Sequence, residues 1–247
     1  MIGLVVVSHS PALANAAVDL ALQMVPGEKP AIAIAAGAGE GLIGTDALAV
    51  SAAIDRVCSP DGVLVIMDLG SAVMSAEMAL EFRSSDAPVR LSSAPFVEGL
   101  LAAIVTAASG ASLDDVDREA RGALTPKLQM LEDSAPAPEP SSAPEPSNPG
   151  ESAESDGLSV DLTIINPDGL HARPAATLVS TLAGFDAKLT VVNLRTVTKP
   201  VAANSLIGLL SLGAKAGDVL TVTASGAQAA EALAMVTAMV NDGFGEL

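Results

Sequence analysis

The chain has 247 residues, half of them apolar, and a formal net charge of −17. This length suits two ordinary domains better than one, and the apolar half is enough to fill a core in each. Four Phe and no Tyr or Trp leave few aromatic platforms on which nucleic-acid bases could stack. The negative charge would also repel a phosphate backbone. We therefore expect no nucleic-acid partner.

The cysteine count and the hydropathy pattern predict a cytoplasmic protein. Cys58 is the only cysteine, so no disulfide can form within the chain. Residues 1–18 carry no charge, but they lack the basic start of a signal peptide, and a polar Ser-His-Ser-Pro sequence at 8–11 interrupts them. No other charge-free run supplies the roughly 20 apolar residues of a membrane helix. We expect no membrane partner.

The first 131 residues alternate between strand-like and helix-like sequence. Buried strands are expected at 2–7, 31–35 and 63–67, with a weaker one at 89–91. Helices are expected at 11–24, 46–57, 97–108 and 112–131. This alternation predicts an α/β domain over 1–131, a doubly wound parallel sheet with helices on both faces.

Polar residues and glycines follow three of these strands. In open α/β sheets the ligand site lies beyond the carboxyl ends of the strands, so these residues are expected to meet. They offer one imidazole, one carboxylate, hydroxyl groups and glycines whose backbone N–H groups can approach a ligand closely. The candidate site residues are His9, Gly39, Thr45, Asp68, Gly70 and Ser71.

An imidazole beside a carboxylate suits phosphoryl transfer. Imidazole is nucleophilic at neutral pH and is a good leaving group afterwards, so His9 is the candidate carrier. A carboxylate on the other ring nitrogen would fix the tautomer and stabilise the phosphorylated ring, and Asp68 is the candidate for that role.

Two alternatives stay open on these residues alone. The sequence at 8–11 also fits a plain helix start, with Ser10 as the N-cap and Pro11 at the first helical position. Residues 39–44 match the nucleotide-binding pattern Gly-x-Gly-x-x-Gly. They follow the second strand rather than the first, however, and Glu40 would repel a pyrophosphate.

Residues 132–157 predict a disordered linker. They contain six Pro, seven acidic residues and no basic residue, and they lack any large hydrophobic side chain. A flexible chain of this length spans about 28 Å and holds two domains at roughly millimolar effective concentration. Such tethering suits domains that meet briefly and separate.

Residues 158–247 predict a smaller α+β domain, an open-faced sandwich. Strands are expected at 158–165, 187–193 and 219–225, with a fourth near 197–201, and helices at 172–183, 205–212 and 227–241. The sequence Gly-Leu-His-Ala-Arg-Pro-Ala-Ala at 169–176 puts His171 at a helix start. There the free N–H groups, beginning with Ala172, and the Arg173 guanidinium would hold a phosphate. The alternative makes His171 a helix cap and Arg173 a solvated charge.

The motif at 169–176 resembles the signature of HPr, the phosphocarrier of the bacterial phosphoenolpyruvate sugar phosphotransferase system. A second match, Asn-Ser-Leu-Ile-Gly-Leu-Leu-Ser-Leu-Gly at 204–213, resembles that family's short helix and regulatory-serine segment. The resemblance implies that His171 is phosphorylated on Nδ1 and that Arg173 stabilises the phosphate. It also makes Ser205 a candidate site for the regulatory kinase that some bacteria have.

Residues 1–131 resemble the mannose-type enzyme IIA, in the version found in the multiphosphoryl-transfer subunit (DhaM) of phosphotransferase-system-dependent dihydroxyacetone kinases. The matching segments are Val-Val-Ser-His-Ser at 6–10, Gly-Thr-Asp at 44–46 and Met-Asp-Leu-Gly-Ser-Ala at 67–72. The resemblance implies that His9 is phosphorylated on Nε2 with Asp68 as its partner.

Together the resemblances imply a phosphotransferase subunit acting between phosphoenolpyruvate and dihydroxyacetone (glycerone). Phosphate would pass from phosphoenolpyruvate to enzyme I, to His171, to His9 and then to ADP on a DhaL-type partner subunit. No cofactor or metal is expected on this chain, because the phosphoryl group is carried covalently.

Three further expectations concern partners. Some relatives carry an enzyme I-like segment after HPr, and this chain ends at Leu247, so a separate enzyme I is expected as the donor. A homodimer through the N-terminal domain is expected, with the apolar face of 97–131 as its candidate interface. Two other functions stay open, a phosphocarrier that regulates a transcription factor or enzyme, and a IIA donor to the IIB domain of a sugar transporter.

Overall fold

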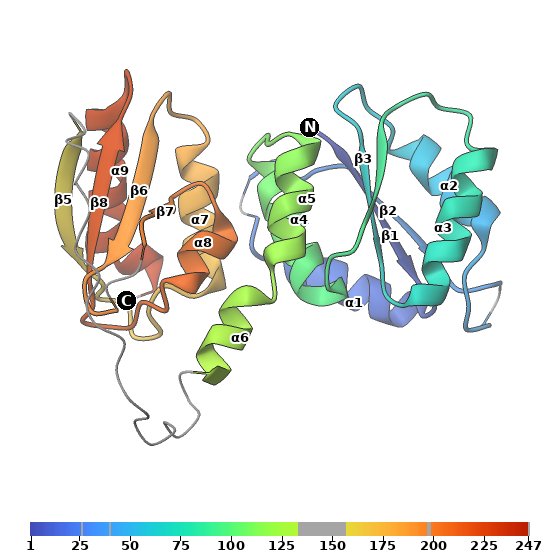
Figure 1. The fold of residues 1–247 in the computed structure, drawn as a ribbon, viewed down its shortest axis with the longest axis horizontal. Coiled ribbons are helices and arrows are strands. Elements are labelled where there is room, and N and C mark those ends of the chain that lie inside the picture. Colours follow the sequence, from blue (N-terminus) through green and yellow to red (C-terminus); the bar gives the residue numbers. More distant parts are fainter. Residues whose placement is uncertain (26, 40, 133–156, 197–198, 247) are drawn as a thin grey trace, which may run out of the picture.

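The computed structural model describes residues 1–25, 27–39, 41–132, 157–196 and 199–246. Of the linker expected at 132–157, all but the two end residues lies outside the described residues. The described chain forms two units, each built on its own four-stranded sheet (Figure 1).

The N-terminal unit contains a parallel sheet with the strand order β2-β1-β3-β4. Its strands are β1 (Gly3–Ser8), β2 (Ile32–Ala36), β3 (Val63–Met67) and β4 (Val89–Ser92). Central β1 is buried at every position because both neighbours and both faces cover it. The continuous apolar sequence of the first strand predicted this burial.

Helices cover both faces of the sheet, as predicted. They are α1 (Pro11–Leu22), α2 (Ala47–Arg56), α3 (Gly70–Phe82) and α4 (Phe96–Ala108). Leu4 and Val6 of β1 pack in one hydrophobic cluster with α1 and α4, whereas Val5 and Val7 pack in another with α2 and α3. Alternating side chains of one strand thus supply two cores, which confirms a doubly wound domain.

Two helix predictions need correction. The helix expected at 112–131 is two helices, α5 (Leu113–Gly122) and α6 (Thr125–Glu132). Gly122 is a weak helix former, and Pro126 has no N–H to continue the helix from α5, so the helix breaks between them. Helix α3 was not predicted, because its buried positions are only Ala72, Ala76 and Ala79, too small to give an apolar stripe.

The C-terminal unit is an antiparallel sheet with the order β5-β8-β6-β7. Its elements are β5 (Leu158–Thr163), α7 (Ala172–Leu182), β6 (Lys188–Asn193), β7 (Val201–Ala202), α8 (Leu206–Ser211), β8 (Val219–Ser225), α9 (Ala229–Asn241) and the 3-10 turn η1 (Gly243–Gly245). Along β8, buried residues alternate with partly exposed ones, so helices cover one face only. The predicted α+β sandwich is confirmed; of the fourth strand only β7 is described, and 197–198 lie outside the described residues.

The two units contact each other through helices. Helices α4, α5 and α6 of the first unit pack against α7 and α8 of the second, and α4 and α5 lie between the parallel sheet and the C-terminal unit (Figure 1). Leu100 and Ile104 of α4 are fully buried within the chain. In this arrangement the apolar face expected to form a dimer is therefore covered by the chain itself.

No helix among the described residues combines the length and the apolar character needed to cross a membrane.

Asp218 fixes the turn before β8. Its carboxylate accepts hydrogen bonds from Lys215 N, Arg195 Nε and Asn193 Nδ2 at 2.9, 2.7 and 3.0 Å. Burial raises the pKa of the Asp218 carboxyl, but these hydrogen bonds and the Arg195 charge outweigh it and lower the pKa to about 2.

We predict that Asp218→Asn destabilises the C-terminal unit at pH 7 and that this difference disappears in acid. The folded pKa lies below the unfolded value of about 3.9, so the ionised carboxylate stabilises the fold above that pH. The stabilisation is lost as the pH falls toward 2. Thermal unfolding followed by NMR signals of residues 158–246 measures this. Asp161→Asn is the matched control, since Asp161 is exposed and accepts a hydrogen bond from the Thr221 hydroxyl. A difference that does not change between pH 4 and pH 2 would contradict the role of this carboxylate.

Candidate functional site

His9 lies in the turn between β1 and α1, at the carboxyl edge of the parallel sheet. Ser10 is the N-cap of α1 and accepts from Leu13 N at 3.3 Å, and Pro11 opens the helix. The helix start considered from the sequence is therefore present. It does not compete with a functional site, because the cap presents the His9 ring at the sheet edge.

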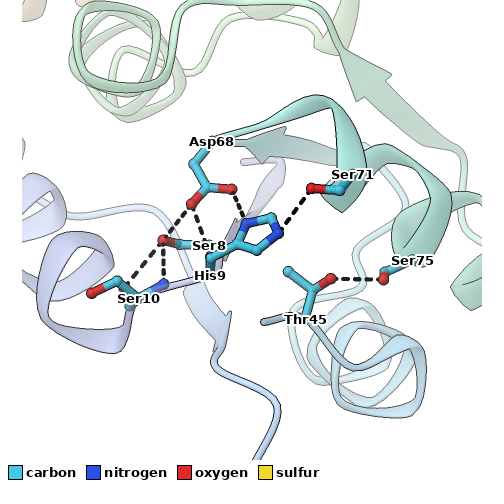
Figure 2. A network of polar contacts seen from close by, with 7 residues as sticks. All are labelled: Ser8, His9, Ser10, Thr45, Asp68, Ser71 and Ser75. Carbon is cyan, nitrogen blue, oxygen red and sulfur yellow. Dashed lines mark hydrogen bonds and ion pairs between the residues drawn. The ribbon is translucent and has the colours of Figure 1, made fainter. Parts of the chain in front are cut away.

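The structure brings Asp68, from the end of β3, to His9 (Figure 2). The carboxylate lies 2.9 Å from Nδ1 of His9 and accepts the backbone N–H of His9 at 2.8 Å. It also accepts the hydroxyl of Ser8 at 2.9 Å. A carboxylate can only accept hydrogen bonds, so Nδ1 carries the proton and Nε2 keeps the lone pair. Nε2 is therefore the nucleophilic nitrogen of His9.

Asp68 is held in its ionised form. Burial raises the pKa of its carboxyl, but hydrogen bonds from the His9 backbone, the His9 ring and Ser8 outweigh this effect and leave the pKa below its usual value. The Asp68 side chain is 6% exposed and the His9 side chain 18%. A buried negative charge beside Nδ1 would favour the positive charge that the ring would acquire if Nε2 were phosphorylated.

The Nε2 side of the ring faces the start of α3. Ser71 Oγ lies 2.9 Å from Nε2 and donates to it, and Thr45 Oγ1 is bonded to Ser75 Oγ at 2.7 Å. In Figure 2 both Ser71 and Thr45 lie on the Nε2 side of the imidazole. Gly70 is the first residue of α3, and no side chain caps that helix. Its free N–H groups and the two hydroxyls form a cradle for a phosphoryl group on Nε2.

The glycine-rich segment after β2 wraps around the histidine turn. Gly37 N donates to Ser8 O at 3.0 Å, and Gly44 N donates to His9 O at 3.1 Å. Gly39 has a φ of +121° within this loop, and among the described residues it makes no hydrogen bond to His9. Helix α2 begins only at Ala47, so the segment does not open a helix as a nucleotide-binding turn does.

His171 is the N-cap residue of α7. Its Nε2 lies 3.0 Å from a carboxylate oxygen of Glu246, and Asn166 Nδ2 donates to the same oxygen at 3.3 Å. By the same argument as for Asp68, Nε2 carries the proton and Nδ1 keeps the lone pair. The His171 side chain is 38% exposed, and its nucleophilic nitrogen is Nδ1.

The backbone around His171 is fixed by a close approach to another loop. Gly169 has a φ of +70°, and a Cβ at that position would lie 2.3 Å from Ala214 O. Leu170 N donates to the same carbonyl at 2.8 Å. No side chain caps α7, so the N–H groups of Ala172 and Arg173 are available to a phosphate. Arg173 is exposed and makes no ion pair among the described residues.

The structure thus forms two separate groups of candidate site residues, one around each histidine. His9 meets Asp68 and Ser71 directly, with Thr45 and the start of α3 nearby. His171 meets Glu246, which the sequence analysis did not identify, because an acidic residue close to the chain end has no spacing that links it to a histidine 75 positions earlier. The described residues contain no cluster suited to a metal ion.

Comparisons with known proteins agree with this division. The family model described as PTS system fructose IIA component matches residues 3–117, and the model described as PTS HPr component phosphorylation site matches residues 158–242. Over its whole length the chain is 42% identical to the protein named "PEP-dependent dihydroxyacetone kinase, phosphoryl donor subunit DhaM" from Pantoea ananatis, and also 42% identical to its namesake from Escherichia coli.

The chain spans about half of those relatives, 51% of each. Among solved structures, HPr from Thermoanaerobacter tengcongensis is 36% identical, with 36% of this chain and 98% of that chain covered at a TM-score of 0.34.

We predict opposite neutral tautomers for the two histidines, Nδ1–H for His9 and Nε2–H for His171. Asp68→Asn should release the tautomer of His9 alone, and Glu246→Leu should release that of His171 alone, so each variant is the control for the other. Ring ¹⁵N NMR shifts of the neutral rings, measured in mildly basic solution, report the tautomers. Phosphorylation of the affected histidine should slow by roughly 10²- to 10⁴-fold. A His9 ring protonated on Nε2 in the wild type would contradict the assignment.

Proposed function

We propose that this chain, a homologue of the DhaM phosphoryl donor subunits that joins a IIA domain to an HPr domain, is the phosphohistidine relay of a phosphoenolpyruvate-dependent dihydroxyacetone kinase. One observation carries the proposal. Each histidine is held by a carboxylate through one ring nitrogen, and the free nitrogens are Nδ1 of His171 and Nε2 of His9. The two rings therefore offer a donor and an acceptor nitrogen, and among the described residues only the Ser71 hydroxyl bonds to either of these nitrogens.

The transfer step follows from this chemistry. The Nε2 lone pair of His9 attacks the phosphorus carried on Nδ1 of His171, in line with the breaking P–N bond. The electron pair of that bond returns to Nδ1 of His171. Asp68 stabilises the positive ring that forms at His9, and the cradle at the start of α3 receives the phosphoryl oxygens. Glu246 keeps the proton on the distal nitrogen of His171 throughout.

We propose enzyme I as the donor to His171 and ADP on a DhaL-type partner subunit as the acceptor from His9. The names of the relatives support this assignment, since each is called the phosphoryl donor subunit of a PEP-dependent dihydroxyacetone kinase. The nucleotide belongs to the partner in this proposal, which agrees with a glycine-rich segment that wraps the His9 turn and opens no helix. The cytoplasm as compartment and the modification of Ser205 by a kinase stay predictions.

The relay predicts an order of labelling. With phosphoenolpyruvate and enzyme I, His171→Ala should abolish label at His9, whereas His9→Ala should leave His171 labelled. The readout is acid-labile phosphate on each domain after cleavage between them. Label at His9 that does not need His171 would refute the order. Labelled protein that phosphorylates a IIB domain but yields no ATP from ADP with a kinase partner would favour the transporter alternative.

We also propose that the N-terminal unit forms a homodimer, as enzyme IIA domains of this fold commonly do. The α4 face is covered, but α3 exposes an apolar strip made by Met74, Met78 and Phe82, which are 70%, 54% and 52% exposed. We take this strip as the proposed dimer interface. Light scattering should give about twice the chain mass of 24.5 kDa. Replacing both Met74 and Met78 by Glu should halve it, and a wild-type mass of one chain would remove the proposal.

A further inference from the structure

The contact between the two units centres on one polar interaction. Glu119 of α5 accepts the hydroxyl of Ser205 at 2.9 and 2.8 Å and also accepts Ile207 N at 3.3 Å. Ser205 is the N-cap of α8, and its Oγ accepts Gly208 N at 2.9 Å. Ile207 lies against Gly122, where an added Cβ would be 3.7 Å from its Cγ2. A side chain of the N-terminal unit thus bonds to the first turn of a helix in the other unit.

The rest of this contact is typical of an interface that opens. Apolar residues of α4 join those of α7 and α8 in one cluster, so docking buries hydrophobic surface. Yet a cavity of about 540 Å³ lies in the seam, lined by both units. Thr106 lines it, and the buried hydroxyl of Thr106 has no hydrogen-bond partner in the described part of the chain. A permanent core is close-packed and satisfies its polar groups, whereas a seam with this cavity resembles the contact of two domains that separate.

The docked arrangement does not bring the two histidines together. Transfer needs the reacting atoms at about 3–3.5 Å. His171 bonds to Glu246, beside the chain end marked C in Figure 1, and His9 follows the end of β1, on the other side of α4 and α5. The helices that make the contact lie between these two places. Transfer within one chain therefore requires the two units to undock.

We propose that Glu119 and Ser205 form a latch that holds the chain in a docked arrangement unable to pass phosphate from His171 to His9. The existence of the latch rests on the contact alone, whereas its effect on phosphate transfer rests on the proposed relay. Glu119 carries a negative charge within hydrogen-bond distance of the Ser205 hydroxyl. An anionic group on Ser205 would be repelled by the Glu119 carboxylate. This repulsion would replace the hydrogen bond between the two side chains and separate α8 from α5.

Ser205→Asp tests the latch without removing the cap of α8, because Asp is among the preferred N-cap residues. The variant should increase the radius of gyration of the full chain in small-angle scattering. It should also speed single-turnover transfer from phosphorylated His171 to His9 by at least about fivefold, the lower end of typical coupling between sites. Adding Glu119→Lys should restore both values by pairing Lys with Asp. Ser205→Ala, which removes a bond but adds no charge, should fall between wild type and Ser205→Asp.

Three outcomes would overturn the latch. These are an unchanged radius of gyration in Ser205→Asp, an expanded chain that transfers no faster, or a double variant that stays expanded. The double variant also separates the latch from simple misfolding. Only a direct contact between positions 119 and 205 predicts that exchanging the charge at 119 makes the chain compact again. If no variant, wild type included, passes phosphate to His9, the relay fails, and the scattering still decides whether the latch exists.

Discussion

The acceptor-only character of a carboxylate determines the chemistry of both sites. Placed on Nδ1 of His9, Asp68 leaves Nε2 as the nucleophile, and placed on Nε2 of His171, Glu246 leaves Nδ1. The surrounding fold positions both carboxylate–histidine pairs. The edge of the parallel sheet brings Asp68 across 59 positions to His9, and the turn after α9 brings Glu246 across 75 positions to His171.

The two sites differ in how firmly the carboxylate is held. Asp68 is 6% exposed and has three hydrogen-bond donors, which keep it ionised despite burial. Glu246 is 18% exposed and lies in a short tail, supported by Asn166. A well-buried carboxylate stabilises the phosphorylated ring strongly, whereas a more exposed one does so less. In the proposed relay this difference would favour transfer from His171 to His9, because the acceptor ring would gain the stronger counter-charge.

The sequence predicted what depends on local pattern. Apolar runs located β1, β2 and β3, and β4 was expected as a weaker strand. The rule that ligands bind beyond the carboxyl ends of parallel strands predicted that His9 and Asp68 meet. The sequence could not predict features that depend on small residues or on contacts between distant positions. Helix α3 buries only Ala72, Ala76 and Ala79, which leave no apolar stripe in the sequence. The apolar pattern over 112–131 continues across Gly122 and Pro126, so it predicts one helix where the structure has two. Glu246 and Glu119 act across 75 and 86 positions, where no periodicity connects the partners.

In the proposed relay, joining both carriers in one chain has a disadvantage that separate carriers do not have. Tethering raises the encounter rate of the two domains, but it equally raises the occupancy of any unproductive contact between them. The helices α4 and α5 supply such a contact, with apolar surface that would otherwise face water. In the proposed latch, the contact between Glu119 and Ser205 limits that cost, because one added negative charge at Ser205 would shift the balance toward the open state. The docked arrangement would then cover a hydrophobic face while closed and leave the chain free to transfer phosphate once open.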